Sequence, residues 1–176
     1  MDFKQNHFEL FGLQPAFRID TARLEKAYRE IQNQVHPDRF ASSGDAEKRL
    51  SMQWATQANE AYQVLKLSLT RANYLLHLQG IDALLATNTS MPPAFLMQQM
   101  DWREALADAR SARDTDTLDQ LMKDMRGEVK RLEIELASQI DDVKDYEAAA
   151  VSVRKLKFLQ KLMQEIGDAQ EELELA

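Results

Sequence analysis

Apolar residues recur with helical spacing along almost the whole chain, in stripes separated by short polar stretches. The first long stripe has positions three, four, seven and eleven residues after its start: Leu24, Ala27, Tyr28, Ile31 and Val35. This spacing places one apolar face on an α-helix. Asp20 is a suitable N-cap for it, and Pro37 disfavours helical geometry at His36. The pattern therefore predicts a helix that begins after Asp20 and ends at His36.

A second stripe begins near Asp45 and predicts a helix that breaks near Ser68 and ends before Gly80. Its inner positions are Leu50, Trp54, Ala58, Ala61, Leu65, Leu69 and Ala72. Asn6 caps a short helix ahead of these two, with Gly12 just beyond it. Because each long helix has a single stripe to bury, the two are expected to pack as an antiparallel hairpin with short flanking helices.

The second half contains three further helical patterns, at 93–112, 116–143 and 146–174, with Asp116 and Asp145 as expected N-caps. The middle helix has a seam at Leu118, Met122, Met125, Val129, Leu132 and Leu136. The third has its core positions at Ser152, Leu156, Leu159, Met163, Ile166 and Leu173. We expect an all-α protein with residues 1–78 as one domain, 79–92 as a junction marked by Gly80, a Thr-Asn-Thr-Ser run and Pro92, and 93–176 as a three-helix bundle.

Composition excludes several functional classes. The 176 residues include no cysteine, so neither a disulfide nor a thiolate metal site is possible. No histidine follows His77, which disfavours a carboxylate metal site of the Glu-x-x-His kind, and we expect no cofactor or metal. Residues 79–176 carry 12 basic and 20 acidic side chains, and neither half has the basic stripe of a nucleic-acid binder. No signal sequence and no apolar run of about 20 residues is present, so we expect a cytoplasmic protein without membrane segments.

The tripeptide His36-Pro37-Asp38 lies between the first two long helices. There it is expected to form a stiff exposed loop, in which Asp38 offers an anionic acceptor suited to a bidentate arginine. Without its flanks, the same tripeptide would be read as a helix end followed by a turn. The flanks Leu24–Ile31 and Asn59–Leu65, in this order, make residues 6–78 resemble a J domain, the module that stimulates heat-shock ATPases of the DnaK class.

The resemblance implies that His36, Pro37 and Asp38 contact the ATPase, together with basic residues of the second helix and loop. The matching basic positions are Lys26, Arg29 and Arg39. Three positions where general-purpose J proteins are usually basic hold Glu25, Glu30 and Gln34. This departure favours a dedicated partner ATPase.

The helix at 93–112 carries two apolar arcs, although a three-helix bundle needs only one. Its expected core arc is Phe95, Gln99, Trp102, Leu106 and Ala109. A second arc, rimmed by Asp101 and Glu104, holds Leu96, Met97 and Met100. This arc either binds another protein or packs against the first domain or the third helix. Phe158, at the margin of the third helix's core, either belongs to the core or extends that patch.

Four segments resemble the HscB family of iron–sulfur co-chaperones: Ser68–Leu76, Phe95–Met100, Arg103-Glu104 and Val153–Leu159. The family resemblance implies that the second domain binds the scaffold protein IscU and presents it to the specialised ATPase HscA. The matching client-binding positions are Leu96, Met97, Met100, Asp101, Glu104 and Phe158. No zinc-binding cysteines precede the J domain, which favours a bacterial type. Two alternatives stay open, a J protein for another ATPase and client, and a helical adaptor without chaperone activity.

Overall fold

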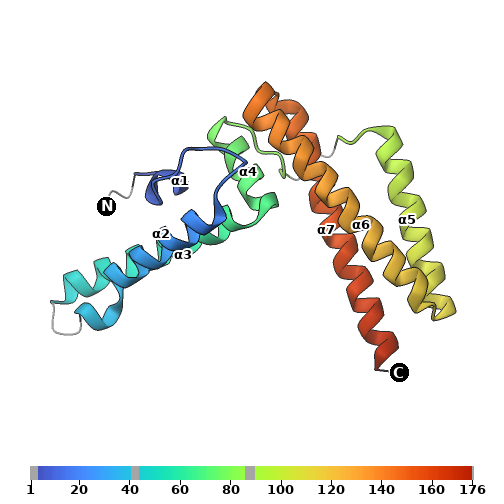
Figure 1. Ribbon diagram of the computed structural model, residues 1–176, viewed down its shortest axis with the longest axis horizontal. Coiled ribbons are helices and arrows are strands. Elements are labelled where there is room, and N and C mark those ends of the chain that lie inside the picture. Colours follow the sequence, from blue (N-terminus) through green and yellow to red (C-terminus); the bar gives the residue numbers. More distant parts are fainter. Residues whose placement is uncertain (1–3, 41–43, 86–89, 176) are drawn as a thin grey trace. The chain divides into compact units, whose positions relative to one another are not determined.

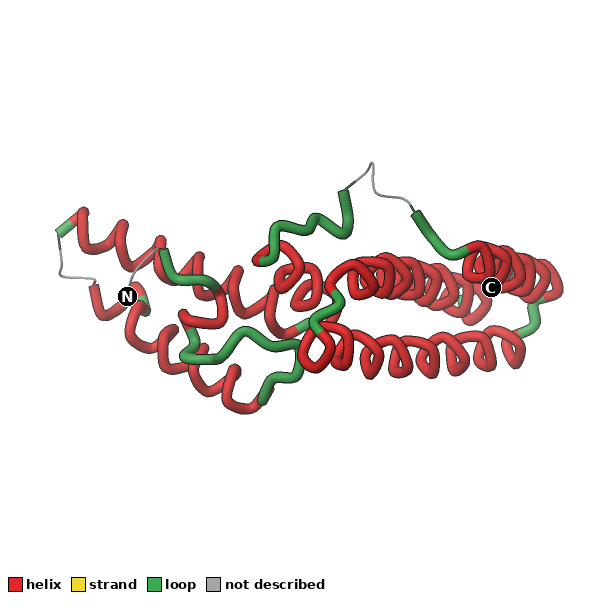
Figure 2. Tube along the Cα trace, turned by 90° about the horizontal axis from the view of Figure 1, so that it is seen from above, coloured by secondary structure: helices red, strands yellow, loops and turns green. Residues whose placement is uncertain are grey.

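The computed structural model describes residues 4–40, 44–85 and 90–175, and every regular element in these ranges is helical (Figure 2). In chain order the elements are α1 (His7–Leu10), α2 (Thr21–Val35), the 3₁₀ turn η1 (Pro37–Phe40), α3 (Asp45–Lys66), α4 (Ser68–Leu78), α5 (Pro93–Ala112), α6 (Thr115–Ala137), the π-helical turn η2 (Ser138–Val143) and α7 (Tyr146–Glu174). The chain divides into two compact units, Met1–Leu75 and Leu76–Ala176. The all-α prediction is confirmed.

In the first unit, α2 and α3 lie side by side and antiparallel, as expected from their single apolar stripes (Figure 1). Tyr28 of α2 stacks on Tyr62 of α3 with ring centroids 4.1 Å apart. The Tyr28 hydroxyl also donates to Oδ1 of Asn59 over 2.6 Å. The predicted caps are confirmed, because the side chains of Asn6 and Asp20 accept hydrogen bonds from the first turns of α1 and α2.

The predicted break near Ser68 is confirmed, and side chains from the next helix stabilise it. Leu67 is extended, so the last carbonyls of α3 lack helical partners. Thr70 donates to the Val64 carbonyl over 2.7 Å, and Arg71 Nη1 donates to the Leu65 carbonyl over 2.6 Å. Arg71 Nε also donates to the Phe17 carbonyl, which ties α4 to the chain ahead of α2. The break is therefore a fixed corner within the first unit.

The second unit is the predicted three-helix arrangement of α5, α6 and α7, in which α6 and α7 pack along most of their lengths. Its buried positions include Leu118, Met125, Leu132, Leu136, Leu156, Leu159 and Ile166. Met122, Val129, Met163 and Leu173, also assigned to these faces, are half-buried. The expected core face of α5 is only partly confirmed, because Phe95 and Ala109 are buried whereas Gln99, Trp102 and Leu106 are half-buried.

Three sequence predictions are wrong in detail. Leu50 is 46% exposed, because at this end of α3 Ser51 faces α2 and donates to the Val35 carbonyl over 2.6 Å. The cap of α6 is Asp114, which accepts from the Thr117 N–H, while Asp116 lies in the first turn. The helix expected over 116–143 changes to the π-helical turn η2 after Ala137. The loop predicted at 36–38 runs into η1, which extends to Phe40. Residues 41–43 lie outside the described residues, as do 86–89 of the predicted junction.

Candidate functional site: two exposed surfaces on separate units

The segment His36, Pro37 and Asp38, here called the HPD turn, follows directly on α2. His36 has ψ 131°, far from helical values, as expected for a residue before proline. The chain then turns through η1, so the segment is a bend and does not continue α2. The His36 side chain is 58% exposed and that of Asp38 is 90% exposed. The turn therefore presents an imidazole and a carboxylate to solvent.

Backbone N–H groups of the HPD turn and the next residue hold the bend and the His36 side chain in place. The Asp38 backbone N–H donates to Nδ1 of His36 over 3.3 Å, and the Arg39 N–H donates to the His36 carbonyl over 3.0 Å. Because Nδ1 acts as an acceptor in this geometry, the ring proton of the neutral imidazole lies on Nε2, which then serves as a donor. Nδ1 lies 3.6 Å from Oδ2 of Asp38, beyond hydrogen-bonding distance. The turn thus offers an N–H donor and a carboxylate acceptor.

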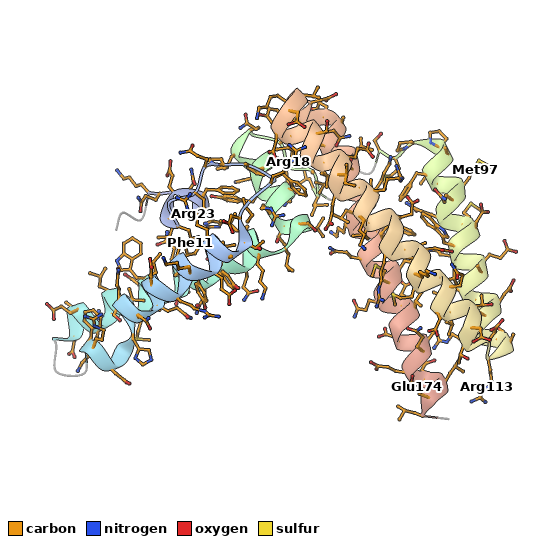
Figure 3. All side chains as sticks on the ribbon, viewed as in Figure 1. Phe11, Arg18, Arg23, Met97, Arg113 and Glu174 are labelled. Atoms are coloured by element: carbon orange, nitrogen blue, oxygen red, sulfur yellow. The ribbon has the colours of Figure 1, made fainter. Side chains whose placement is uncertain are left out.

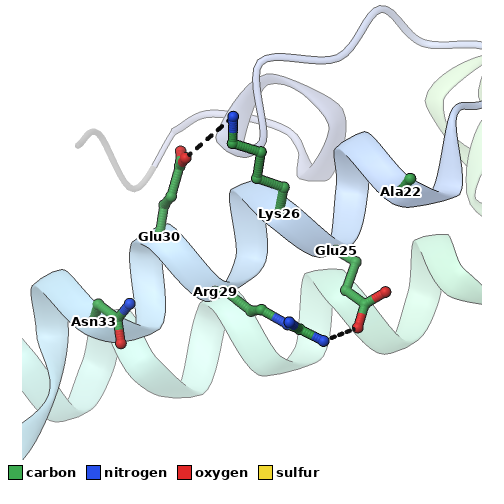
Figure 4. Close-up of a pocket in the computed structure, with 6 residues that line it drawn as sticks. All are labelled: Ala22, Glu25, Lys26, Arg29, Glu30 and Asn33. Carbon is green, nitrogen blue, oxygen red and sulfur yellow. Dashed lines mark hydrogen bonds and ion pairs between the residues drawn. The ribbon is translucent and has the colours of Figure 1, made fainter.

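The basic residues predicted to act with the HPD turn are all exposed, but each has a local partner. Lys26 and Arg29 form i,i+4 ion pairs on α2, with Glu30 and Glu25 respectively (Figure 4). These four side chains, with Ala22 and Asn33, line a shallow depression on the outer face of α2 (Figure 4). This face is therefore charge-balanced. Arg39 Nη1 folds back to the Asn33 carbonyl near the end of α2, over 3.2 Å.

The second predicted surface lies on α5 and is exposed within the second unit. Leu96 is 46%, Met97 68% and Met100 71% exposed, and we call these three residues the α5 patch. Figure 3 shows Met97 projecting outward from the helix. Asp101 and Glu104 are also exposed and rim the patch. Among the possibilities left open by the sequence, packing of this arc on α7 is excluded by the exposure of its three residues.

Phe158 of α7 is half-buried in an aromatic cluster with two residues of α5. The Phe95 ring meets it edge-on at a centroid distance of 5.8 Å, and the Trp102 ring stacks on it at 6.4 Å with 21° between the planes. Phe95 and Trp102 also meet edge-on at 6.0 Å. We call Phe95, Trp102 and Phe158 the aromatic cluster. Phe158 is thus partly buried and partly exposed, so it neither belongs wholly to the core nor lies wholly in the exposed patch.

A cation extends the aromatic cluster toward solvent. The guanidinium carbon of Arg103 lies 5.4 Å from the centroid of the Phe158 ring, and Nη1 of the same residue lies 3.2 Å from Oε2 of Glu165 on α7. The sequence pattern did not predict these contacts between α5 and α7. Helical periodicity assigns a residue to a face of its own helix, but it does not say which residue of a neighbouring helix lies opposite.

The described residues provide no group of three or more His, Asp or Glu side chains placed to hold a metal ion. Within the same ranges, no helix is long and apolar enough to cross a membrane. The exposed polar turn and the exposed apolar patch are both surfaces suited to protein partners.

Comparison with known proteins identifies the family. The family model of the HSCB C-terminal oligomerisation domain matches residues 91–167. A co-chaperone protein HscB homolog from Azoarcus sp. (strain BH72) is 51% identical over 174 residues, which cover 99% of this chain and 98% of that protein. An HscB homolog from Burkholderia vietnamiensis is also 51% identical, with 99% of each chain covered.

Solved structures agree with this result. The chaperone HscB from Vibrio cholerae superposes with a TM-score of 0.84 at 36% identity, covering 96% of this chain and 99% of that one. For human co-chaperone protein HscB the TM-score is 0.88 at 29% identity, with 95% and 83% covered. The reading as a helical adaptor without chaperone activity is therefore wrong. The chain belongs to the HscB family of co-chaperones, non-enzymatic proteins that work in iron–sulfur cluster assembly.

Proposed function

We propose that the first domain, residues 1–78, stimulates the ATPase of an HscA-like chaperone through the HPD turn. The observation that supports this most directly is the exposure of His36 and Asp38 in a bend after α2. An exposed carboxylate can accept a bidentate arginine, and the Nε2–H of His36 can donate to an acceptor on the same partner. The Lys26, Arg29 and Arg39 side chains provide positive charge on the same helix and turn.

The charge balance of α2 supports a dedicated ATPase partner. Glu25 and Glu30 pair with Arg29 and Lys26, so little net positive potential remains on this face. An ATPase that binds through an acidic surface alone would gain little here, since exposed ion pairs are weak and salt-screened. A partner that contacts both the acidic and the basic member of each ion pair would not lose affinity through this charge balance. The charge balance therefore favours a dedicated ATPase over a general DnaK-like one, and membership of the HscB family favours an HscA-like protein as that partner.

We assign client binding to residues 93–176, through the α5 patch, Asp101, Glu104 and Phe158. The client is an IscU-like scaffold protein, as membership of the HscB family implies. Exposed methionines suit such a surface, because the unbranched thioether side chain adapts to its partner. The acidic rim favours a client surface with basic residues beside its apolar contact.

Two partners bound by one chain raise the effective concentration of client at the ATPase. The protein itself carries neither a cofactor nor a metal in this scheme, and it makes no contact with nucleic acid or membrane. The absence of cysteine from all 176 residues agrees with a reducing compartment, and we place the protein in the cytoplasm.

The test is a set of steady-state ATPase assays with purified HscA-like and DnaK-like proteins, each with and without an IscU-like scaffold. We expect the chain and the scaffold together to stimulate the HscA-like enzyme well beyond the product of their separate effects. The DnaK-like enzyme should show no such joint effect. Equal stimulation of both enzymes would contradict the dedicated partner, and stimulation of neither would contradict the assignment of the HPD turn.

A further inference from the structure

Trp102 is one of two tryptophans in the chain and has no role in the surfaces proposed above. It is half-buried, and its ring stacks on Phe158. Phe95, which is 7% exposed, meets both rings edge-on and is fixed in the core of the second unit. The Phe158 ring therefore has a buried aromatic edge on one side and the face of Trp102 on another.

The position of the aromatic cluster relative to the α5 patch follows from helix geometry. Leu96, Met100 and Arg103 are spaced i, i+4 and i+7, which places them along one stripe of α5. Arg103 also lies over the Phe158 ring, at 5.4 Å from its centroid. Phe158 belongs to α7, but through Arg103 it lies beside the stripe of α5 that carries Leu96 and Met100 of the α5 patch.

An aromatic side chain at such an edge has a defined orientation only if neighbours hold it. A ring free to rotate about χ1 would lose conformational freedom when a client bound, and this loss would weaken binding. The stack with Trp102 and the edge contact with Phe95 restrict the ring before the client arrives. Offset stacks and edge contacts at these distances are favourable arrangements for aromatic pairs.

On the basis of the client surface proposed above, we infer that Trp102 is a positioning residue for client binding. It holds Phe158 in the orientation in which that ring meets the scaffold protein. Trp102 acts through Phe158 and makes no essential contact of its own with the client. The stack crosses from α5 to α7, so it also fixes Phe158 relative to the α5 patch.

The experiment measures the dissociation constant of a purified IscU-like scaffold for the full chain by isothermal titration calorimetry. Loss of one aromatic pair predicts that Trp102→Ala weakens binding roughly three- to tenfold. Trp102→Phe, which keeps an aromatic face over Phe158, should restore most of the affinity. Trp54→Phe is the matched control, because Trp54 lies in α3 of the other unit and should leave client affinity unchanged.

A double-mutant cycle separates positioning from direct contact. If Trp102 acts through Phe158, adding Trp102→Ala to Phe158→Ala protein should change the dissociation constant less than about twofold. Additive effects would overturn the inference, as would wild-type affinity of the Trp102→Ala single variant. Thermal unfolding and far-ultraviolet circular dichroism must match wild type, and Trp102→Leu replaces Trp102→Ala if the latter unfolds.

Failure of this inference is distinguishable from failure of the proposed function. If Leu96→Ser/Met100→Ser protein binds the scaffold as wild type does, the client surface itself is wrong and the role of Trp102 falls with it. If that double variant and Phe158→Ala both bind weakly while Trp102→Ala binds normally, the client surface stands and only the positioning role is overturned.

Discussion

The HPD turn exposes polar atoms on a short segment between two helices, whereas the α5 patch exposes apolar side chains along little more than one turn of one helix. Short-range hydrogen bonds hold the His36 ring and the bend that carries Asp38. Flexible side chains dominate the patch, with Met97 and Met100 the most exposed of them. A contact that must act at one place on an ATPase needs defined geometry, while a surface that holds a client needs apolar area and adaptability.

The two surfaces are also recognised by different signals in the sequence. The HPD turn is a short motif whose meaning depends on the helices around it. The α5 patch is apolar surface in excess of what the fold requires. It can be recognised in the sequence only after the core face of the same helix has been assigned. The variants below should therefore separate the two surfaces, each affecting one activity and leaving the other intact.

The largest effect is expected from Asp38→Asn, which removes the charge of a side chain that is 90% exposed in the HPD turn. Loss of one partner of a charge-assisted pair costs about 2–5 kcal/mol at an interface, so stimulation of the ATPase should fall at least roughly tenfold. Client affinity and helicity should not change. Glu47→Gln, an exposed acid in the first turn of α3, is the matched control and should stimulate normally. Full stimulation by Asp38→Asn protein would rule out the docking role of the turn.

The second-largest effect is expected on scaffold binding, from substitutions in the α5 patch. Leu96→Ser/Met100→Ser should weaken scaffold binding roughly ten- to a hundredfold, since truncation of each of the two side chains is expected to cost about 1 kcal/mol and about 1.4 kcal/mol is tenfold in affinity. Stimulation of the ATPase in the absence of scaffold should stay at the wild-type level. Ile134→Ser is a close control, because Ile134 is 72% exposed on α6 of the same unit. Equal loss of binding in the control would mean that the patch is not the specific contact.

A smaller effect should come from the charge pairs on α2. Glu25→Gln/Glu30→Gln frees Arg29 and Lys26 from their partners and makes this face positive. We expect stimulation of a DnaK-like ATPase to rise by a few fold at low ionic strength and to return toward the wild-type value at high salt. Gln34→Glu, which adds a negative charge on the same helix, should lower rather than raise that stimulation. No change with DnaK-like enzyme would mean that these pairs do not set partner choice.

Local chemistry accounts for what the sequence could predict of the fold. Asn6, Asp20 and Asp145 cap their helices as expected, and the extended Leu67 separates α3 from α4. The cap of α6 was misplaced because two aspartates two residues apart both suit an N-cap. The left-handed Arg113, with φ 55°, ends α5 so that Asp114 is the first residue with cap geometry. Sequence spacing gives no indication of this backbone conformation.

Contacts between residues of different helices could not be predicted from the sequence at either surface. Periodicity identifies the second apolar arc of α5, and the proline rule predicts the bend at the HPD turn. Periodicity alone did not decide whether that arc is exposed. Contact of Phe158 with Trp102 and Arg103 depends on how α5 packs on α7, which periodicity does not specify. Leu50 was misassigned for a related reason, since the buried side of α3 near its start is set by the Val35 carbonyl of α2.

The smallest expected effect concerns that misplaced cap. Asp114→Ala should lower the melting temperature by a few degrees, because the side chain accepts from the Thr117 N–H at the start of α6. Asp116→Ala should have a smaller effect, since Asp116 lies in the first turn of α6, where its charge stabilises the helix through the dipole. Hydrogen bonds from Thr117 hold the pKa of Asp114 below its usual value.

That pKa shift also predicts how the cap depends on pH. A carboxyl with a lowered folded-state pKa stabilises the protein fully above its unfolded-state pKa of 3.8. The contribution is lost as the pH falls through the lower folded-state value. The difference in melting temperature between wild type and Asp114→Ala should therefore be constant near neutral pH and shrink in strong acid. A difference that grows in acid would contradict the cap assignment.

The central claim is that the two surfaces work because one chain carries both. The most direct measurement mixes Asp38→Asn protein with Leu96→Ser/Met100→Ser protein and records the scaffold-dependent ATPase rate of the HscA-like enzyme. Each variant retains the surface that the other lacks. We expect the mixture to give no more joint stimulation than either variant alone, because client and ATPase are then held by different molecules. Recovery of the wild-type joint rate at equal protein concentration would contradict the claim.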